Sequence, residues 1–392
     1  MKTKILINKR ALLVELIALF ALTTFSQKLW PFSINQIIGV FIFVAVLWNY
    51  FPIKTLRHSI ILLASILCVA VTFVFTENVG QNASQAVYWL IGIWTLFLIS
   101  RDEFNAKFYE SIRKHQKLIR FCVILGDLVL VLSFTLRQSY RYTWGGRYFE
   151  GFCTSPHTLA AACCLLLSLA TVSIFDDQTE DDHPLRKFLL LVPGAIGILQ
   201  SGARTFVIPL FILVIIYYRV CIKKISIKVI AFPVGVLGVL YAFLHSGIYE
   251  KMVFQGSSNT NAISNGRVEF WLADLAAFMR SSAINKVLGS GFDFITRVNY
   301  ETVGTAIGGH NDFITCLLAV GFLGTLLYVS SLFRVFKYLL RKKNRLNAIL
   351  LIMYCLFPAM INGFYGYVQL LLSFVVLTAL FQHTSSCANK PA

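Results

Sequence analysis

The stretch GGHNDFITCLLAVGFLGTLLY, from Gly308 to Tyr328, joins a polar segment to an apolar helix. His310 and Asn311 stand at the boundary, and Gly321 and Gly324 follow inside the apolar part. Histidine is the side chain that changes its charge near neutral pH, so a His at a membrane boundary can carry protons. Two small residues on one helix let another backbone come close. The simpler interpretation is an interfacial His with two glycines used only for packing.

Composition places this helix in a membrane. Of the 392 residues, 57% are hydrophobic and only 14% are charged, with a mean hydropathy of +0.71. Because a soluble globular protein carries about 25% charged residues, we expect an all-α polytopic integral membrane protein. The sequence contains no C-x-x-C motif and no His/Cys cluster with metal-ligand spacing, so we predict neither a metal site nor a cofactor.

Apolar segments recur along the chain and predict about twelve transmembrane helices. We expect them near residues 11–25, 34–51, 59–75, 86–100, 119–136, 158–175, 188–200, 206–222, 227–245, 312–333, 347–361 and 366–382. The expected domains are an N-terminal transmembrane bundle of about nine helices (1–245), an extracytoplasmic loop (246–311), C-terminal transmembrane helices (312–382) and a cytoplasmic tail (383–392).

The distribution of charge predicts which side each loop faces. A net charge of +17 would suit nucleic-acid binding, but most of the Lys and Arg residues gather in the N-terminal tail and in alternate loops. That alternation follows the positive-inside rule, which holds for short loops. We therefore expect both termini in the cytoplasm, membrane lipids around the helices and no nucleic-acid partner. The one loop with an acidic start, residues 176–187, also carries Arg and Lys.

The longest loop, residues 245–309, is expected outside. Its middle, SNGRVEFWLADLAAFMR, has apolar residues at helical spacing, which predicts an amphipathic helix on the outer surface. The apolar positions are Val268, Trp271, Leu272, Leu275 and Phe278. The following segment, residues 285–294, predicts a Gly-rich turn that leads towards His310.

Two arginines outside the membrane are candidates for binding an anion. Arg204, in LQSGARTFVIPL, lies in a short outer turn between apolar segments, where a charge without a partner is costly. Arg267 opens the amphipathic helix, where free N–H groups also attract anions. Guanidinium geometry suits phosphate. The alternatives are that Arg204 snorkels to the interface and that Arg267 is a solvated surface residue.

The outer loop RQSYRYTWGGRYFEGFCTSPH, residues 137–157, combines arginines with aromatic residues. Its candidate substrate-binding residues are Arg141, Tyr142, Trp144 and Arg147, because aromatic faces and polar groups together suit sugar rings. An ordinary interfacial aromatic belt with scattered arginines explains this composition equally well.

A His followed by Asn, then nine residues, then G-x-x-G resembles the signature of the O-antigen ligase and polymerase superfamily (the Wzy/WaaL type). In the ligase branch of that family, one Arg lies outside the membrane between two helices, and a second opens the helix of the large periplasmic loop. Arg204, Arg267 and His310 occupy these places in the same order. The resemblance is specific from about residue 200 to residue 328, and before that only the hydropathy matches.

The resemblance implies a metal-independent, inverting glycosyltransferase of cell-surface polysaccharide biosynthesis, which makes O-antigen (lipopolysaccharide), capsule or exopolysaccharide. Its donor is an undecaprenyl-diphosphate-linked glycan. Arg204 and Arg267 would stabilise the charge that grows on the leaving diphosphate, and His310 would take the proton of the acceptor hydroxyl. Asn311 is expected to orient His310, and Asp312 is an alternative orienter or base. Both are also candidate substrate-binding residues.

The acceptor separates two activities within the family. A polymerase adds the growing chain to another carrier-linked repeat unit, and a ligase transfers it to the lipid A core. The HNDF motif with GRVEFW upstream favours the polymerase. The resemblance also implies a flippase and a chain-length regulator as assembly partners. It places the active site on the extracytoplasmic face of the bacterial inner (cytoplasmic) membrane.

A function of another class is a transporter or flippase of lipid-linked sugars. A transporter is expected to have discontinuous helices in both halves of the chain, around a site at the middle of the membrane. Here the polar candidates gather at one face and in the second half of the chain, which favours surface chemistry. A third alternative, an assembly scaffold, would need none of Arg204, Arg267 and His310.

Overall fold

The computed structural model describes residues 8–30, 34–51, 55–143, 146–175, 189–222, 238, 240–241, 243–246, 248–249 and 266–387. The regular elements are α1 (Lys9–Thr24), η1 (Gln27–Leu29), α2 (Ile34–Tyr50), α3 (Leu56–Phe75), α4 (Val79–Ile99), α5 (Asp102–Lys114), α6 (Gln116–Phe134), η2 (Arg137–Ser139), β1 (Tyr140–Thr143), β2 (Gly146–Phe149), α7 (Pro156–Phe175), α9 (Val192–Gln200), η3 (Arg204–Phe206), α10 (Val207–Cys221), α14 (Arg267–Arg280), α15 (Ala283–Leu288), α16 (Phe294–Val303), α17 (Asp312–Leu340), α18 (Arg345–Ile361) and α19 (Val368–Cys387).

The described chain is mainly helical and contains helices of membrane-spanning length. Six segments are long and apolar enough to cross a bilayer. They are His58–Phe75, Val79–Ile99, Pro156–Phe175, Arg204–Cys221, Asp312–Leu340 and Val368–Ser385. The predicted membrane protein is thus supported, whereas the predicted number of about twelve spans is not confirmed. A helix lies at each predicted apolar segment except 227–245, most of which is outside the described residues.

Helix length explains part of the smaller number. The helices α1 and α9 have 16 and 9 residues, and α2 and α18 have 17 residues each. A straight helix needs about 20 residues to cross the hydrocarbon. Since α2 and α18 are apolar, hydropathy alone does not separate them from full spans. The helix α6 has 19 residues but carries Lys117, Arg120 and Asp127.

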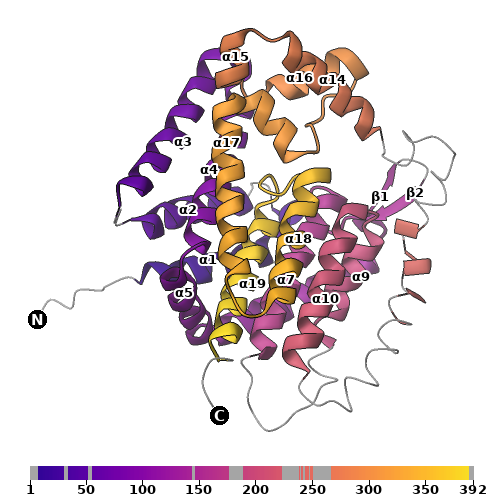
Figure 1. The fold of residues 1–392 in the computed structure, drawn as a ribbon. Coiled ribbons are helices and arrows are strands. Elements are labelled where there is room, and N and C mark those ends of the chain that lie inside the picture. The colour runs from indigo at the N-terminus through magenta and orange to yellow at the C-terminus, as the bar shows by residue number, and fades with distance from the viewer. Residues whose placement is uncertain are drawn as a thin grey trace, which may run out of the picture.

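The centre of the bundle is formed by α7 and α19, which pack against each other (Figure 1). Nearly the whole of α7 is buried, including the small residues Ala160, Ala161 and Ala162, which let neighbouring backbones approach. Ser168 of α7 shares a hydrogen bond with Ser373 of α19, and the Tyr354 hydroxyl also lies 2.5 Å from the Ser373 hydroxyl. Hydrogen bonds of this kind join helices where lipid removes the hydrophobic driving force.

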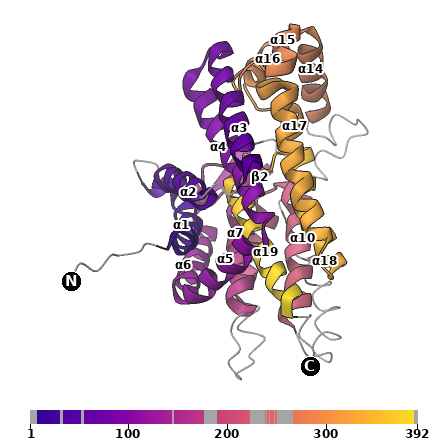
Figure 2. The same cartoon turned by 60° about the vertical axis from the view of Figure 1, so that its left-hand side comes forward.

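At one end of the molecule, α14, α15 and α16 form a group above the bundle (Figures 1 and 2). Asp293 ties this group to the turn between α3 and α4, because its carboxylate accepts hydrogen bonds from the Thr76 hydroxyl at 2.7 Å and from the backbone N–H groups of Glu77 and Asn78. The Gln81 amide donates to the Thr296 hydroxyl over 2.7 Å. The described part of the long loop is therefore anchored on the bundle.

A break in α17 joins it to the same group. Gly321 has φ +65° and lies between two helical stretches, and a Cβ there would overlap the backbone of Val287. The N–H groups of Ser290 and Gly291 donate to the carbonyls of Leu318 and Ala319 over 2.8 and 3.0 Å, next to the break. The prediction that a second backbone approaches the G-x-x-G pair is confirmed at Gly321. Only glycine suits this combination of close approach and left-handed backbone.

The long loop contains more regular structure than predicted. The expected amphipathic helix is present as α14, but the Gly-rich segment after it also forms α15 and the start of α16. Of the predicted apolar face of α14, Val268, Leu272 and Leu275 are exposed, whereas Phe270 and Asp274 are the buried residues. The loop at residues 137–157 forms an unexpected antiparallel hairpin, β1–β2, in which Tyr142 pairs with Arg147.

Candidate functional site

His310 occupies a constrained position just before α17. It is the only non-glycine residue among those described that has a positive φ, at +49°. Histidine tolerates this backbone better than most residues. The preceding residue, Gly309, accepts a hydrogen bond from the indole N–H of Trp271 over 2.8 Å. The helix α14 therefore holds the segment that carries His310, and the position of the imidazole is defined by backbone as well as side-chain contacts.

Asn362, in the turn after α18, connects two of the predicted catalytic residues. Its side-chain oxygen Oδ1 lies 3.2 Å from Nη2 of Arg267 and 3.2 Å from Nδ1 of His310. Its Nδ2 donates to the Tyr367 hydroxyl over 3.1 Å. Three segments that are far apart in the sequence thus converge on one amide, because Arg267 opens α14, His310 precedes α17 and Asn362 ends α18.

These contacts determine which nitrogen of His310 is basic. A guanidinium group can only donate hydrogen bonds, so the Asn362 atom that faces Arg267 is an acceptor oxygen. The Nδ1 atom of His310 faces the same oxygen and must therefore carry the hydrogen. In the neutral imidazole the lone pair is then on Nε2. The geometry makes Nε2 of His310 the atom that can accept a proton.

The surroundings keep His310 neutral. The pKa of His310 is lowered to about 4: burial is the main cause, the nearby Arg267 cation adds to it, and the hydrogen bond to Asn362 opposes the change. A neutral imidazole is the form that a general base requires. At pH 7 His310 is therefore neutral.

Arg267 and Arg204 are close enough to influence each other. Burial lowers the pKa of Arg267, the Tyr367 hydroxyl opposes this, and the charge of Arg204 lowers it further. Arg204 begins η3, in a turn where Gly202 has φ +68° and lies against the ring of Tyr148. Two partly buried cations that repel each other favour an anion between them. The structure thus places Arg267 and His310 on the same side chain, Asn362, and Arg204 near enough to Arg267 to act on its pKa.

Asn311 and Asp312 have clear roles in holding the site. The Asn311 side chain caps α17 by accepting from the N–H groups of Phe313 and Ile314, and its amide donates to the Met360 carbonyl over 2.8 Å. The sequence predicts that Asn311 orients His310, but in the structure the Nδ1–H of His310 donates to Oδ1 of Asn362 instead. The buried Asp312 accepts from the Tyr328 hydroxyl and from two backbone N–H groups of the turn after α18. Their predicted contact with substrate stays a prediction.

The hairpin residues differ from one another. Arg141 forms an ion pair with Glu150 at 3.0 Å, which Lys28 also contacts. The guanidinium of Arg147 stacks on the Tyr140 ring, with 3.7 Å between the guanidinium carbon and the ring centre. Tyr142 is exposed, and Trp144 lies outside the described residues. Arg141 and Arg147 therefore already have protein partners, and Tyr142 is the one described aromatic of this set that stays open to a ligand.

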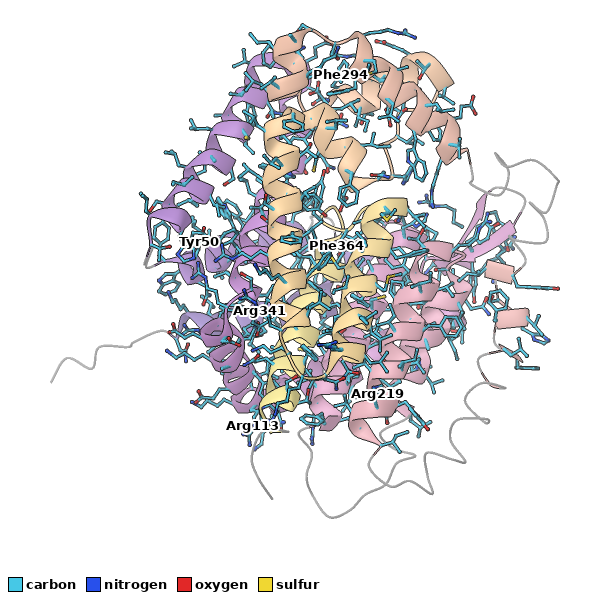
Figure 3. The ribbon with its side chains drawn as sticks, in the orientation of Figure 1. Tyr50, Arg113, Arg219, Phe294, Arg341 and Phe364 are labelled. Carbon is cyan, nitrogen blue, oxygen red and sulfur yellow. The ribbon has the colours of Figure 1, made fainter. Side chains whose placement is uncertain are left out.

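A cavity of about 370 Å³ lies next to His310. It falls in the size range of small-molecule sites. Its walls come from α4, α16, the start of α17 and the turn between α18 and α19. Its polar lining residues are Gln81, Gln85, Thr296, His310, Asn311, Asp312, Thr315, Asn362 and Tyr367. In Figure 3, Phe294 labels the helices above this region and Phe364 the turn below it. The walls are rich in amides and hydroxyls, which suit a neutral ligand with many hydroxyl groups.

Sequence reasoning missed Asn362, Gln81 and Gln85. Asn362 and Gly363 follow an apolar helix, and Asn-Gly there is the ordinary signal for a helix end. Gln81 and Gln85 begin an apolar segment, where polar residues mark a membrane boundary. Only the contact of Asn362 with two residues distant in sequence distinguishes it, and one sequence carries no sign of that contact.

Comparisons add no family assignment. A scan against protein-family models and a search of curated proteins both found no match for this chain. Within the described residues, no group of three or more His, Cys, Asp and Glu side chains is arranged to hold a metal ion.

Proposed function

We propose that the protein is a membrane glycosyltransferase that moves a glycan from a polyprenyl diphosphate carrier to a hydroxyl group of an acceptor. The observation that carries the proposal is the Asn362 amide, which holds a guanidinium and the Nδ1–H of a neutral imidazole on one oxygen. A base with a free Nε2 and two neighbouring cations are the groups that this reaction needs.

The proposed reaction is a single displacement at the anomeric carbon C1. Nε2 of His310 takes the proton of the acceptor hydroxyl while its oxygen forms the new bond to C1. The bond from C1 to the diphosphate oxygen breaks on the opposite face, and its electron pair leaves with the polyprenyl diphosphate. The configuration at C1 is therefore inverted. Arg204 and Arg267 stabilise the negative charge that grows on the leaving group.

The cavity supplies the place for the acceptor. Gln81, Gln85 and Thr296 line the wall formed by α4 and α16, and the imidazole of His310 lines the same cavity. An acceptor sugar held by these groups would present a hydroxyl to Nε2. Arg204 and Arg267 do not line this cavity, so the donor diphosphate is proposed to approach from their side of Asn362. In this arrangement the donor and the acceptor lie on different sides of the His310 imidazole.

The membrane location and the acceptor remain part of the proposal. We place the His310 end of α17 on the extracytoplasmic face of a bacterial inner membrane, with both termini in the cytoplasm. The HNDF sequence with GRVEFW upstream resembles capsule and exopolysaccharide polymerases, which favours a repeat unit on a second carrier as the acceptor. A lipid A core acceptor would make the protein an O-antigen ligase.

The break in α17 is the one observation that favours a transporter. Transporter sites use the free carbonyls of broken helices to coordinate substrates or ions. Here the carbonyls of Leu318 and Ala319, beside the break, accept hydrogen bonds from the N–H groups of Ser290 and Gly291. Because these carbonyls already accept hydrogen bonds from the protein, we assign the break a structural role in the proposed transferase. That role is to anchor α15 on α17.

A complementation gel tests the function. Wild type and His310→Asn are expressed at matched levels in a strain that lacks the gene, and surface and carrier-linked polysaccharides are resolved by length. Asn tolerates the positive φ of position 310, so the change removes the base without straining the backbone. We expect a ladder for wild type and single repeat units on the carrier for the variant, which identifies a polymerase.

Two other results would change the assignment. Long chains that stay on the carrier and never reach the lipid A core would identify a ligase. A variant that matches wild type would exclude His310 as the base, and the transporter or scaffold would then be the better account.

A further inference from the structure

A second cavity, of about 460 Å³, lies at the other end of α17. It is lined by one face of the last turns of α17 and by Ser100 and Asp102, at the junction of α4 and α5. No residue lines both this cavity and the cavity next to His310. It is therefore separate from the proposed transfer site.

The cavity has an excess of positive charge. Its lining includes Arg334, Lys337, Arg341 and Lys342 but only one carboxylate, Asp102. Lys342 forms an ion pair with Asp102. Arg334 stacks on Phe97, with its guanidinium carbon 4.2 Å from the ring centre.

Two of these cations face the cavity without an anionic partner. Within the described residues, neither Lys337 nor Arg341 has a carboxylate at ion-pair distance. They are four residues apart on one helix, and like charges at this spacing repel. An anion bound in the cavity would be attracted to both cations and would offset their mutual repulsion.

A half-buried arginine beside the cavity lining adds a second observation. Arg101 lies between the two lining residues Ser100 and Asp102, and its guanidinium is 5.4 Å from the centre of the Tyr50 ring. Its Nε and Nη2 atoms are buried and have no hydrogen-bond acceptor among the described residues. Burial lowers the pKa of Arg101, and Tyr50 and Glu103 oppose the change. A cation with two unsatisfied donors next to a cationic cavity points to an anionic ligand.

The position of the cavity identifies its chemical surroundings. From Phe313 to Phe333, α17 carries no charged residue, and Arg334 begins the charged part. The cavity therefore begins where the uncharged part of the second stretch of α17, after the break at Gly321, gives way to cations. Phe333 lines the cavity and is 65% exposed, which gives the cations an apolar neighbour at the boundary.

We propose that this cavity binds a phosphate group, carried by an anionic phospholipid headgroup or by a free phosphate ester. Lys and Arg near a membrane surface attract anionic headgroups, and guanidinium and ammonium groups are the usual partners of phosphate. In Figure 3, Arg341, Arg219 and Arg113 label the half of the molecule opposite Phe294, where this cavity lies. The site does not depend on the proposed transferase activity.

The test uses the purified full-length protein in detergent. Phosphatidylglycerol is added, and bound lipid is counted by native mass spectrometry for wild type, for Lys337→Gln/Arg341→Gln and for Lys343→Gln/Arg345→Gln. The control pair removes the same charge from exposed residues at the same end that do not line the cavity. Equal melting temperatures without lipid establish that the variants are folded.

We expect wild type and the control pair to bind phosphatidylglycerol, and the Lys337/Arg341 pair to bind it about tenfold more weakly or worse. Competition by sn-glycerol 3-phosphate identifies the source of the phosphate. If millimolar sn-glycerol 3-phosphate does not displace the lipid, the phospholipid is the ligand. If it displaces the lipid, the ligand is a free phosphate ester. The proposal is overturned if neither compound binds, or if the two double variants lose binding equally.

Discussion

The two ends of α17 use positive charge in different ways. At the His310 end, Arg267 is partly buried, donates to Asn362 and lies near a second guanidinium, and the amide orients an imidazole beside it. At the other end, Lys337 and Arg341 are exposed on one face of the helix, and Lys342 pairs with Asp102. The first set is held by a network, and the second is open to an anion.

The difference teaches that residue type and net charge do not define a site. Both ends contain arginines and a cavity of a few hundred Å³. Only the His310 end combines cations with a neutral proton acceptor of defined tautomer. Chemistry is therefore assigned to that end, and binding alone to the other.

The largest expected difference in transfer rate is between Arg267→Gln at the His310 end and Lys337→Gln at the other end of α17. Arg267→Gln is expected to lower glycan transfer by about 10²–10³, because it removes a donor from the charge that grows on the leaving group. Lys337→Gln is expected to change transfer by about twofold or less, as for an ordinary surface substitution. The measurement is the rate of product formation by purified protein. If both variants lost the same transfer activity, the two ends of α17 could not be given different roles.

A smaller effect is expected at Asn362. Asn362→Ala leaves Arg267 and His310 without their shared acceptor, and a loss of about 10–100-fold in transfer follows from an unsatisfied group worth about 1–3 kcal/mol. Asn362→Asp keeps an acceptor oxygen, so it should retain more activity than the Ala variant. Its carboxylate should also raise the pKa of His310. An Ala variant as active as wild type would show that the amide has no role in positioning.

The pH dependence of transfer sharpens the assignment of the base. His310 must be neutral to act, and its pKa is lowered to about 4, so the rate should fall only as the pH drops towards about 4. Arg267→Gln removes the cation that lowers this pKa, so the acid limb of the pH profile should move upwards, towards the ordinary value of about 6.5. Lys337→Gln should leave the limb in place. If Arg267→Gln left the acid limb in place, the conclusion that Arg267 lowers the pKa of His310 would be wrong.

The smallest expected effect concerns stability at the His310 end of α17. Asp274 in α14 is fully buried, burial raises its pKa to about 7, and Asn299 opposes the rise. Because the folded state binds this proton more tightly than the unfolded state, its contribution to stability is fully present below about pH 4 and is lost as the pH rises to about 7. Asp274→Asn should remove that loss and raise the melting temperature at pH 8 by a few degrees. The measurement is the melting temperature of wild type and variant at pH 5 and pH 8. The account is contradicted if the melting temperature of the variant changes with pH as much as that of wild type.

The elements that sequence alone predicted are those with a local signal. The start of α14 at Arg267, the start of α17 after His310 and the close approach at Gly321 all follow from periodicity, capping residues and glycine spacing. Each needs information from only a few neighbouring residues. Arg267 and His310, two of the three predicted catalytic residues, share Asn362 as a partner, and their catalytic role stays a prediction.

The missed features depend on contacts between distant segments. Asp293 binds the turn at residues 76–78, and Asn362 binds Arg267, which is 95 positions earlier in the chain. Neither contact has a periodic or local signature. The hairpin was missed because its aromatic and Arg residues have the composition of a membrane-interface loop. Its alternation extends over only four residues in each strand.

The most direct test of the central claim is chemical rescue of His310→Gly in purified protein. Glycine accepts the φ of +49° and leaves space for a free imidazole molecule. With a polyprenyl-diphosphate-linked glycan as donor, the account predicts a loss of about 10²–10⁴ in the transfer rate and partial recovery when imidazole is added. Transfer by the Gly variant at the wild-type rate, or a loss that imidazole does not relieve in a folded variant, would contradict the claim that His310 is the base.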